Sequence, residues 1–391
     1  MMSAAHISKD VQTCLHSRQE VMTKFIGDLA RMESPSSDRE SLLEILKWLE
    51  RQFTALGMYT IRVPGIESGG YLYARPKQRI PGQPVQLLLG HCDTVWPLDT
   101  LREMPLSEAK GRLAGPGVYD MKAGIAQIFF ALRCLKDLSL QPSVLPVLLI
   151  NSDEEIGSRE STPAIRRLAR IADRAFVLEP PLGLEGKLKT ARKGLGRFTL
   201  TVYGKAAHAG LDPEKGANAI VEMARLVQQL YALNDFDTGT TVNVGLIEGG
   251  ISPNTIAPIS RVVLDVRVPT TSEGVRVEKI IRSLKAETEG VRLEIEGGFG
   301  RPPMERTPGN RQLWSLAAKT GKVLGIELEQ AAAGGGSDAN TTSQYTATLD
   351  GLGTPGDGAH ARHEHIQTDR LAERTSLLTL LLMLDPLKRN R

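Results

Sequence analysis

The feature that most constrains this chain is a series of short, mostly apolar runs, each followed closely by acidic or histidine side chains. His91 and Asp93 follow VQLLL, Glu154 and Glu155 follow LPVLLI, and Glu179 follows AFVL. Short apolar strands that alternate with helices are typical of an α/β sheet covered by helices on both faces. In such sheets a ligand binds beyond the carboxyl ends of the strands. We therefore expect these side chains to meet at one edge of a central sheet.

Residues at helical spacing alternate with these runs in the first half of the chain. The predicted elements are helices at 39–56, 121–138 and 163–169 and strands at 85–89, 145–150 and 175–178. Asp120 therefore lies at the N-terminal end of a predicted helix, where an ordinary N-cap is the simplest role. Its flanking glycines, in GPGVYDMKAG, favour a functional carboxylate instead.

The hydrophobic pattern changes near Gly194, where half-buried, alternating strands replace the continuous apolar runs. The predicted elements there are strands at 197–203, 241–249, 261–268 and 291–299 and helices at 218–233 and 272–289. Their order fits a compact ferredoxin-like (βαββαβ) unit inserted in the chain. Helix–strand alternation resumes after about Arg306. We therefore predict a discontinuous catalytic domain at 1–193 and 306–391, interrupted by an inserted domain at 194–305.

The composition argues against several classes of function. The 391 residues carry 48 basic and 45 acidic side chains, interspersed, so no nucleic-acid footprint is expected. No apolar run approaches the roughly 20 residues of a membrane span, and the N-terminus lacks the apolar core of a secretory signal. Three cysteines without a CxxC pair argue against a disulfide framework. We expect a cytoplasmic protein without nucleic-acid or membrane partners.

The predicted cluster of carboxylates and imidazoles indicates a metal centre. Carboxylates that are held together repel one another and do not stay ionised without a cation among them. His360, in GDGAHARHEH, and Asp120 add two further ligand types to the residues that follow the strands. This number of ligands predicts two ions rather than one.

Two pairs of neighbouring residues have distinct predicted roles. His91 and Asp93 are two apart on an extended segment and point the same way, so Asp93 could orient a metal-binding His91. The alternative for this pair is a capped strand end. Glu154 and Glu155 point in different directions, so one can bind metal while the other takes a proton from water. Adjacent glutamates are more commonly solvated surface, but these follow a buried strand.

Several candidates lie outside this cluster. His208 in GKAAHAG, Asn254 in SPNTIAP and the glycine loop GGGSDAN could line a site or be purely structural. Arg267 could clamp a carboxylate or be a surface charge. The glycine loop matches neither a P-loop nor a dinucleotide fingerprint.

The motifs together resemble one family, the co-catalytic di-zinc exopeptidases and deacylases. They are HCD, GPGVYDMKAG, DEEIGS, LEP, GKAAHAG, NTIAP, DVR, GGGSDAN and GDGAH, and the resemblance runs from about Ile26 to the end of the chain. KAAHAGLDPEKGANAI, GGGSDA and DGLGTPGDGAH are most similar to the glutamate carboxypeptidase branch. Related activities are those of acetylornithine deacetylase, succinyl-diaminopimelate desuccinylase and aminoacylase.

The resemblance implies a role for each residue of the predicted metal centre. His91 and Glu179 would hold one zinc ion, Glu155 and His360 the other, and Asp120 would bridge them. Cobalt or manganese could replace zinc, because this ligand set suits several divalent ions. The resemblance further implies that Glu154 is the general base, that Asp93 orients His91, and that the peptide bond after Asp120 is cis. GAH spacing favours His360 as the ligand over His363 and His365.

The resemblance also implies roles for the inserted domain, as a lid that often forms homodimers. His208 would stabilise the oxyanion, Arg267 and Asn254 would bind a substrate carboxylate, and the glycine loop, with Gly335 and Gly336, would line the pocket. Arg192 and Lys193, which depart from the branch's pattern, could contact an anionic substrate or be surface charges.

The expected reaction is hydrolysis of an amide bond next to a free carboxylate in a peptide or N-acyl amino acid. One hypothesis is a carboxypeptidase that releases a C-terminal, glutamate-like amino acid. The alternative is an N-acyl-amino-acid deacylase similar to acetylornithine deacetylase. A third hypothesis, a catalytically inactive binding protein, predicts that a ligand or the base is missing, whereas all of them are present in the sequence.

Overall fold

The computed structural model describes residues 4–387, which divide into two compact units. Unit 1 runs to Ala191 and includes Arg306–Ala333 and the chain from Ser337 onward. Unit 2 comprises Arg192–Glu305 and Gly334–Gly336. Each unit has its own hydrophobic core. Among the described residues, no helix has both the length and the apolar character needed to cross a membrane.

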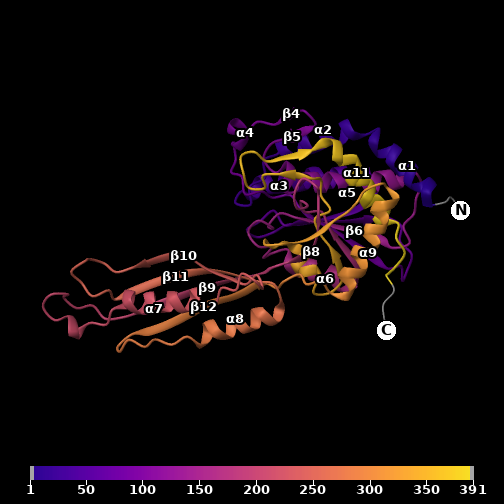
Figure 1. The fold of residues 1–391 in the computed structure, drawn as a ribbon. Helices are drawn as coiled ribbons and strands as arrows, with labels where there is room; N and C mark the ends of the chain where they lie inside the picture. Colours follow the sequence, from indigo (N-terminus) through magenta and orange to yellow (C-terminus); the bar gives the residue numbers. More distant parts are fainter. Residues whose placement is uncertain (1–3, 388–391) are drawn as a thin grey trace. The chain divides into compact units, whose positions relative to one another are not determined.

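Unit 1 is built on a six-stranded sheet with the order β1-β2-β6-β3-β7-β14, of which Figure 1 labels β6. Its strands are β1 (Met58–Val63), β2 (Tyr71–Pro76), β3 (Val85–His91), β6 (Leu145–Asn151), β7 (Ala172–Val177) and β14 (Ala347–Leu349). The four strands from β6 to β14 are parallel, and β1 and β2 are antiparallel to their neighbours. Successive residues of β3 and β6 are buried, so helices cover both faces, as the apolar runs predicted.

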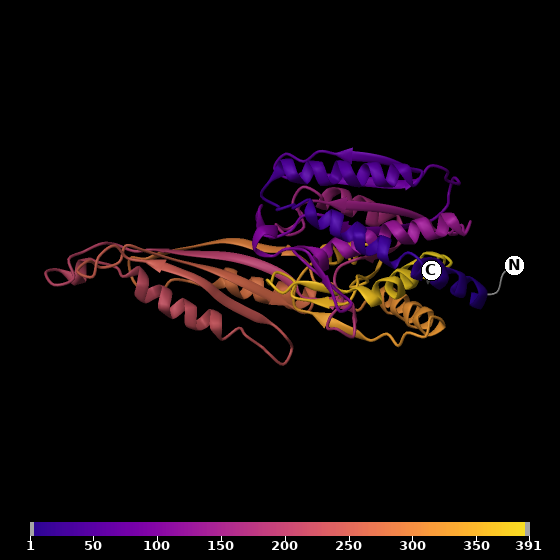
Figure 2. The same cartoon turned by 90° about the horizontal axis from the view of Figure 1, so that it is seen from above.

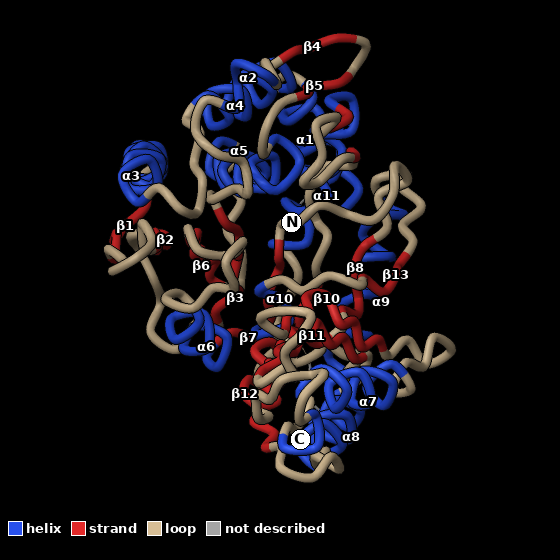
Figure 3. Tube along the Cα trace, turned by 90° about the vertical axis from the view of Figure 1, so that its left-hand side faces the viewer, coloured by secondary structure: helices blue, strands red, loops and turns tan. Residues whose placement is uncertain are grey.

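The helices of unit 1 pack around this sheet, with α5 on one side of β3 and α6 on the other (Figure 3). They are α1 (Ala4–His16), α2 (Gln19–Arg31), α3 (Arg39–Ala55), α4 (Thr100–Glu103), α5 (Ala123–Asp137), α6 (Thr162–Ile171), α9 (Pro308–Val323), α10 (Asp338–Thr342) and α11 (Leu371–Leu382). Asp38 caps α3 by accepting the backbone N–H of Ser41. Stacked and edge-on rings of Phe25, Phe129 and Phe130 join α2 to α5 in the core.

The predicted helix at 121–138 begins later than expected. A single π-helical turn, η1 (Val118–Lys122), precedes α5, and within it Asp120 and Met121 have non-helical backbone angles. The bond between these two residues is cis, as the resemblance implied. Asp120 is therefore not the N-cap of α5, and its carboxylate is available for another role.

Small strands complete unit 1. A four-stranded sheet has the order β15-β16-β5-β4, with β4 (Ser107–Ala109), β5 (Arg112–Ala114), β15 (Gly356–Asp357) and β16 (His365–Gln367). A separate pair joins β8 (Leu188–Arg192) to β13 (Gln330–Ala333). The β5–β16 pairing brings the turn that carries His360 beside the glycine-rich segment that precedes Asp120.

Unit 2 has the predicted βαββαβ order in a fully antiparallel sheet, β10-β11-β9-β12. Its elements are β9 (Gly194–Tyr203), α7 (Ala219–Tyr231), β10 (Thr241–Gly249), β11 (Ile259–Val268), α8 (Thr271–Ser283) and β12 (Arg292–Arg301). Burial alternates along β11, so one face of the sheet is covered, and α7 and α8 lie on that face (Figure 2).

The predicted helix at 272–289 ends six residues early, at Ser283. The backbone N–H groups of Glu287 and Thr288 donate to the buried carboxylate of Glu222 on α7, at 3.2 and 3.0 Å. These bonds to a partner that is distant in sequence replace the helical ones, which periodicity alone could not predict.

Candidate metal centre

Three adjacent parallel strands carry the predicted ligands to one edge of the unit 1 sheet. β3 lies between β6 and β7 and is parallel to both, so the carboxyl ends of all three meet at the same edge. His91 is the last residue of β3, Glu155 follows the end of β6, and Glu179 follows the end of β7. Alternating apolar runs and connecting helices thus bring together side chains that are far apart in sequence.

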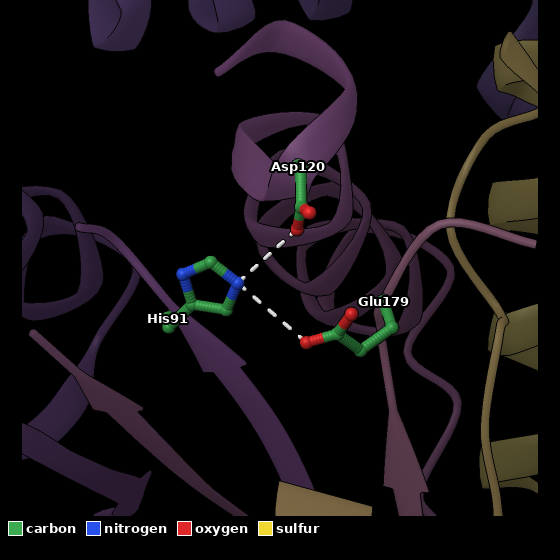
Figure 4. Close-up of side chains that lie close together, drawn as sticks. All are labelled: His91, Asp120 and Glu179. Atoms are coloured by element: carbon green, nitrogen blue, oxygen red, sulfur yellow. Dashed lines mark hydrogen bonds and ion pairs between the residues drawn. The ribbon is translucent and has the colours of Figure 1, made fainter. Parts of the chain in front are cut away.

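The first group of possible ligands is His91, Asp120 and Glu179 (Figure 4). The His91 Nε2 atom lies 3.3 Å from Asp120 Oδ1 and 3.5 Å from Glu179 Oε1. The His91 and Glu179 side chains are buried, with residue exposures of 1% and 7%. One imidazole and two carboxylates therefore face a common point.

The second group is Asp120, Glu155 and His360. The His360 Nε2 atom lies 3.1 Å from Glu155 Oε2 and 3.5 Å from Asp120 Oδ2. Asp120 thus directs one carboxylate oxygen toward the imidazole of His91 and the other toward that of His360. This is the geometry in which one carboxylate could bridge two ions.

The other two histidines of the GDGAHARHEH segment are engaged elsewhere. The His363 Nε2 atom lies 3.7 Å from Asp357 Oδ2. The His365 Nδ1 atom is 2.9 Å from the carbonyl oxygen of His363. Neither belongs to a ligand group found among the described residues, so the geometry favours His360.

The electrostatics of the two groups fit divalent cations. Burial lowers the pKa of His91, but hydrogen bonds to Asp120, Asp93 and Glu179 outweigh it and hold this pKa well above its ordinary range. Hydrogen bonds to Asp120 and Glu155 raise the pKa of His360 to about 10. The carboxylates thus favour positive charge at both points, and mixed nitrogen and oxygen donors suit zinc, cobalt or manganese.

The pKa values of the carboxylates Asp120 and Glu155 shift in opposite directions. Burial raises the pKa of Asp120, yet its hydrogen bonds with His360 and His91 outweigh burial and lower it. Burial raises the pKa of Glu155, and hydrogen bonding to His360 only partly offsets that. Buried carboxylates of this kind are stabilised by a cation that both can share.

Asp93 links the histidine to the paired glutamates. Its side chain is fully buried, and Oδ1 lies 3.3 Å from His91 Nδ1. The same carboxylate accepts the backbone N–H groups of Glu154 and Glu155 at 3.2 and 3.1 Å, and the Ser36 hydroxyl at 2.7 Å. The HCD spacing predicted the contact with the histidine; the contacts with the glutamates had no sequence signal.

Glu154 is half-buried beside the second ligand group but belongs to neither group. Its backbone is fixed by Asp93, while the neighbouring Glu155 turns toward His360. Glu154 is therefore an ionisable side chain next to a possible metal centre, without being one of its possible ligands.

The remaining predicted residues belong to unit 2. His208 and Asn254 are exposed and lie on adjacent loops, joined by the bond from the Ala209 N–H to the Asn254 carbonyl at 2.9 Å. The Arg267 guanidinium donates to Asp265 Oδ1 at 2.8 Å and to the Gly334 carbonyl at 3.0 Å.

The glycine loop is held from two sides. Arg192 is buried and donates to the carbonyls of Gly335 and Gly336 at 3.1 and 3.0 Å, so it is not a surface charge. Arg267 holds the preceding carbonyl of Gly334. The motif ARKG by itself does not predict this role, because the carbonyls that Arg192 binds lie more than 140 residues further along the chain.

Comparison with known proteins gives consistent matches along most of the chain. Residues 87–384 match the family described as Peptidase family M20/M25/M40. Carboxypeptidase G2 from Pseudomonas sp. (strain RS-16) is 27% identical over 375 residues, which cover 93% of this chain and 89% of that protein. Succinyl-diaminopimelate desuccinylase from Delftia acidovorans (strain DSM 14801 / SPH-1) is 27% identical over 315 residues, 75% and 80% of the two chains.

Solved structures have the same fold. The aminopeptidase PepT from Bacillus cereus ATCC 10987 superposes with a TM-score of 0.77 at 23% identity, covering 93% of this chain and 98% of that one. At this identity the likeness shows the fold, in agreement with the α/β architecture expected from the sequence.

Proposed function

Because this chain belongs to peptidase family M20/M25/M40 and is a metal-dependent hydrolase of that family, we propose that it cleaves an amide bond next to a free carboxylate. We propose further that it is a carboxypeptidase, which releases a C-terminal, glutamate-like amino acid from peptides or N-acyl conjugates. The observation that carries the proposal is Asp120, whose two oxygens face the imidazoles of His91 and His360. The similarity to carboxypeptidase G2 over 93% of the chain supports the substrate class.

The proposed metal ligands follow from the two groups. His91 and Glu179 would hold one zinc ion, Glu155 and His360 would hold the second, and Asp120 would bridge them. The shared carboxylate and the short distances between donor atoms support two sites rather than one. When bound, such ions act as Lewis acids, polarising the scissile carbonyl and making water easier to deprotonate.

The chain's own side chains would move and direct the protons. Glu154 is proposed as the general base, which accepts a proton from the attacking water and then transfers it to the nitrogen of the leaving amine. Asp93 would hold His91 in one tautomer through Nδ1. Because the same Asp93 carboxylate accepts a hydrogen bond from the backbone N–H of Glu154, it would also hold the base in a fixed position relative to the ligands.

Unit 2 is proposed to bind the substrate. His208 would donate a hydrogen bond to the developing oxyanion. Arg267 and Asn254 would bind the free carboxylate, and Gly335 and Gly336 would line the pocket. Arg267 is half-exposed and retains donors beyond those bonded to Asp265 and Gly334, which supports a carboxylate-binding role.

Unit 2 is also proposed as a lid that forms a homodimer. β10 is an edge strand, and its Leu246 and Ile247 are exposed to 67% and 64%. On the neighbouring α7, Val221 and Tyr231 are exposed to 60% and 67%. Exposed apolar side chains beside an unpaired strand edge are typical of a surface that another chain covers.

An N-acyl-amino-acid deacylase is the alternative function, and the similarity to succinyl-diaminopimelate desuccinylase supports it. Both activities use the same metal centre and differ in the shape of the pocket that accepts the substrate. Release of free amino acid should therefore be measured on peptidyl-glutamate, N-benzoyl-glutamate and N-acetylornithine, with metal-loaded and chelator-treated protein. Hydrolysis of the glutamate conjugates alone supports the carboxypeptidase; hydrolysis of N-acetylornithine alone supports the deacylase. Equal activity before and after chelation contradicts both.

A further inference from the structure

One buried carboxylate beside the metal centre is neither a ligand nor the proposed base. Glu364 is fully buried, four residues after His360 in the turn that leads into β16. Its carboxylate accepts four hydrogen bonds, from the Trp96 indole and from the backbone N–H groups of Gly117, Tyr119 and Asp120. Burying an unsatisfied carboxylate is costly, so the four donors stabilise this side chain in its buried position.

The three backbone donors belong to a segment that cannot satisfy them internally. Gly117 has a positive φ of 71° and Asp120 has extended angles, so this stretch makes few helical bonds ahead of α5. The first N–H groups of a helix need outside acceptors, and here one carboxylate supplies both of its oxygens. Oε1 holds Tyr119 and Asp120 at 3.0 and 3.1 Å, and Oε2 holds Gly117 at 2.9 Å.

The same carboxylate joins three loops that carry proposed ligands. The Trp96 indole N–H donates to Oε2 at 2.8 Å, which ties in the loop that follows His91. The backbone carbonyl of Glu364 also accepts the Gly115 N–H at 3.1 Å. Glu364 itself belongs to the loop of His360. It therefore connects the segments that carry or follow His91, Asp120 and His360.

We infer that Glu364 is a positioning residue for the metal centre. By holding the backbone of Asp120 to the His360 turn, its carboxylate sets the direction in which the two Asp120 oxygens face the two imidazoles. This inference rests on the proposed metal centre and adds to it the group that fixes the bridging ligand. A side chain that only filled space would not need four donors from two other segments of the chain.

The test replaces the carboxylate by an amide of the same shape. In E364Q one oxygen becomes an NH₂ group, which cannot accept a hydrogen bond, so part of the backbone segment loses its acceptor. Metal-free wild type and E364Q would be titrated with Co²⁺, and the visible absorption spectrum, the number of ions bound and the dissociation constants would be measured. We expect an altered spectrum and affinity weakened by about 10- to 100-fold for at least one ion.

A matched control separates positioning from general stability. Glu222 in unit 2 is buried and accepts the backbone N–H groups of Glu287 and Thr288 in a comparable way. E222Q is expected to lower the unfolding temperature while its cobalt spectrum and stoichiometry match the wild type. If E364Q behaves like E222Q, with a lower unfolding temperature and unchanged cobalt binding, the inference is overturned.

A milder variant covers the case in which E364Q does not fold. Trp96→Phe removes the indole N–H donor while keeping an aromatic, smaller side chain, and it should shift the cobalt spectrum in the same direction by a smaller amount. An unchanged spectrum overturns the inference. A wild type that binds two ions but hydrolyses no substrate overturns the proposed activity and leaves this inference intact. A wild type that binds no cobalt overturns both.

Discussion

The central sheet of unit 1, which is mixed, and the antiparallel sheet of unit 2 differ in how many of their faces are covered. β6 is buried along its whole length and β3 is buried after its first residue, whereas β11 alternates between buried and more exposed residues. When both faces are covered, only the strand ends remain for chemistry, and the possible metal ligands gather there. When one face and the edge strands β10 and β12 stay open, side chains reach solvent from the open face, the edges and the loops.

The two units also differ in how firmly their candidate residues are held. In unit 1 the buried carboxylate of Asp93 fixes a histidine and two glutamates. In unit 2 His208 and Asn254 are exposed on loops that meet through two backbone hydrogen bonds near them. Buried, fully bonded groups suit the positioning of metal ions, while exposed groups suit the capture and release of substrate. The following predictions test this contrast.

The largest effect is expected for Glu154→Gln in unit 1. The amide cannot take a proton from water, so kcat should fall by a factor of about 10² to 10⁴. Because Glu154 belongs to neither ligand group, the number of metal ions bound should not change. The exposed Glu108→Gln variant, also in unit 1, is the control and should keep wild-type kcat. Full activity in Glu154→Gln would remove this residue from the mechanism.

Removal of divalent ions is expected to destabilise unit 1 selectively. An ion that binds only the folded chain stabilises it by about 2.7 kcal/mol at roughly 100 times its Kd. Hydrogen-exchange mass spectrometry should show faster exchange in the segments after β3, β6 and β7 once a chelator is added. Exchange in β9–β12 should stay the same. An equal increase of hydrogen exchange in both units would contradict an ion site confined to unit 1.

An exposed apolar residue on the open edge of unit 2 should control association. Leu246→Glu on β10 is expected to weaken the dimer by about 1.5–3 kcal/mol, the value of burying one such side chain, or at least tenfold in Kd. Sedimentation velocity over a range of concentrations measures this. Ile66→Glu is the control, because Ile66 is 89% exposed and belongs to unit 1. A wild type that is monomeric at every concentration rules out the dimer.

The smallest effect concerns the pH dependence of unit 2. Burial raises the pKa of Glu222, but hydrogen bonds from Arg225 and Thr288 outweigh it and lower the pKa from 4.5 to about 2. This depressed pKa stabilises the fold above about pH 4.5, and the stabilisation is lost as pH falls toward 2. Glu222→Gln should therefore lower stability by about 1.5 kcal/mol at pH 7. Urea unfolding at pH 7 and pH 3 measures the difference, which should shrink at the lower pH; a constant difference would contradict the assignment.

Local pattern predicted most of the elements. The runs that became β3, β6 and β7 are mostly apolar, and the repeat at 39–56 predicted α3 nearly residue by residue. These predictions succeed because the periodicity of apolar residues indicates which faces of a segment are buried. The N-terminal helices α1 and α2 were not predicted, and the start of α5 and the end of α8 were misplaced. The start of α5 is shifted because Asp120 and Met121 have non-helical backbone angles. The end of α8 is shifted because the backbone after it donates to the carboxylate of Glu222.

The sequence by itself determined the α/β class of unit 1, the strand–helix order of unit 2 and the set of chemically capable side chains, because each of these follows from short-range pattern and residue type. Only the tertiary structure decided that Asp120 faces two imidazoles and that Asp93 also accepts hydrogen bonds from the backbone of Glu154 and Glu155. It likewise decided that the Arg192 guanidinium donates to the glycine loop. Those facts depend on contacts between residues tens to hundreds of positions apart. Such contacts form because hydrogen-bonding groups buried during folding must find partners wherever the packed chain supplies them.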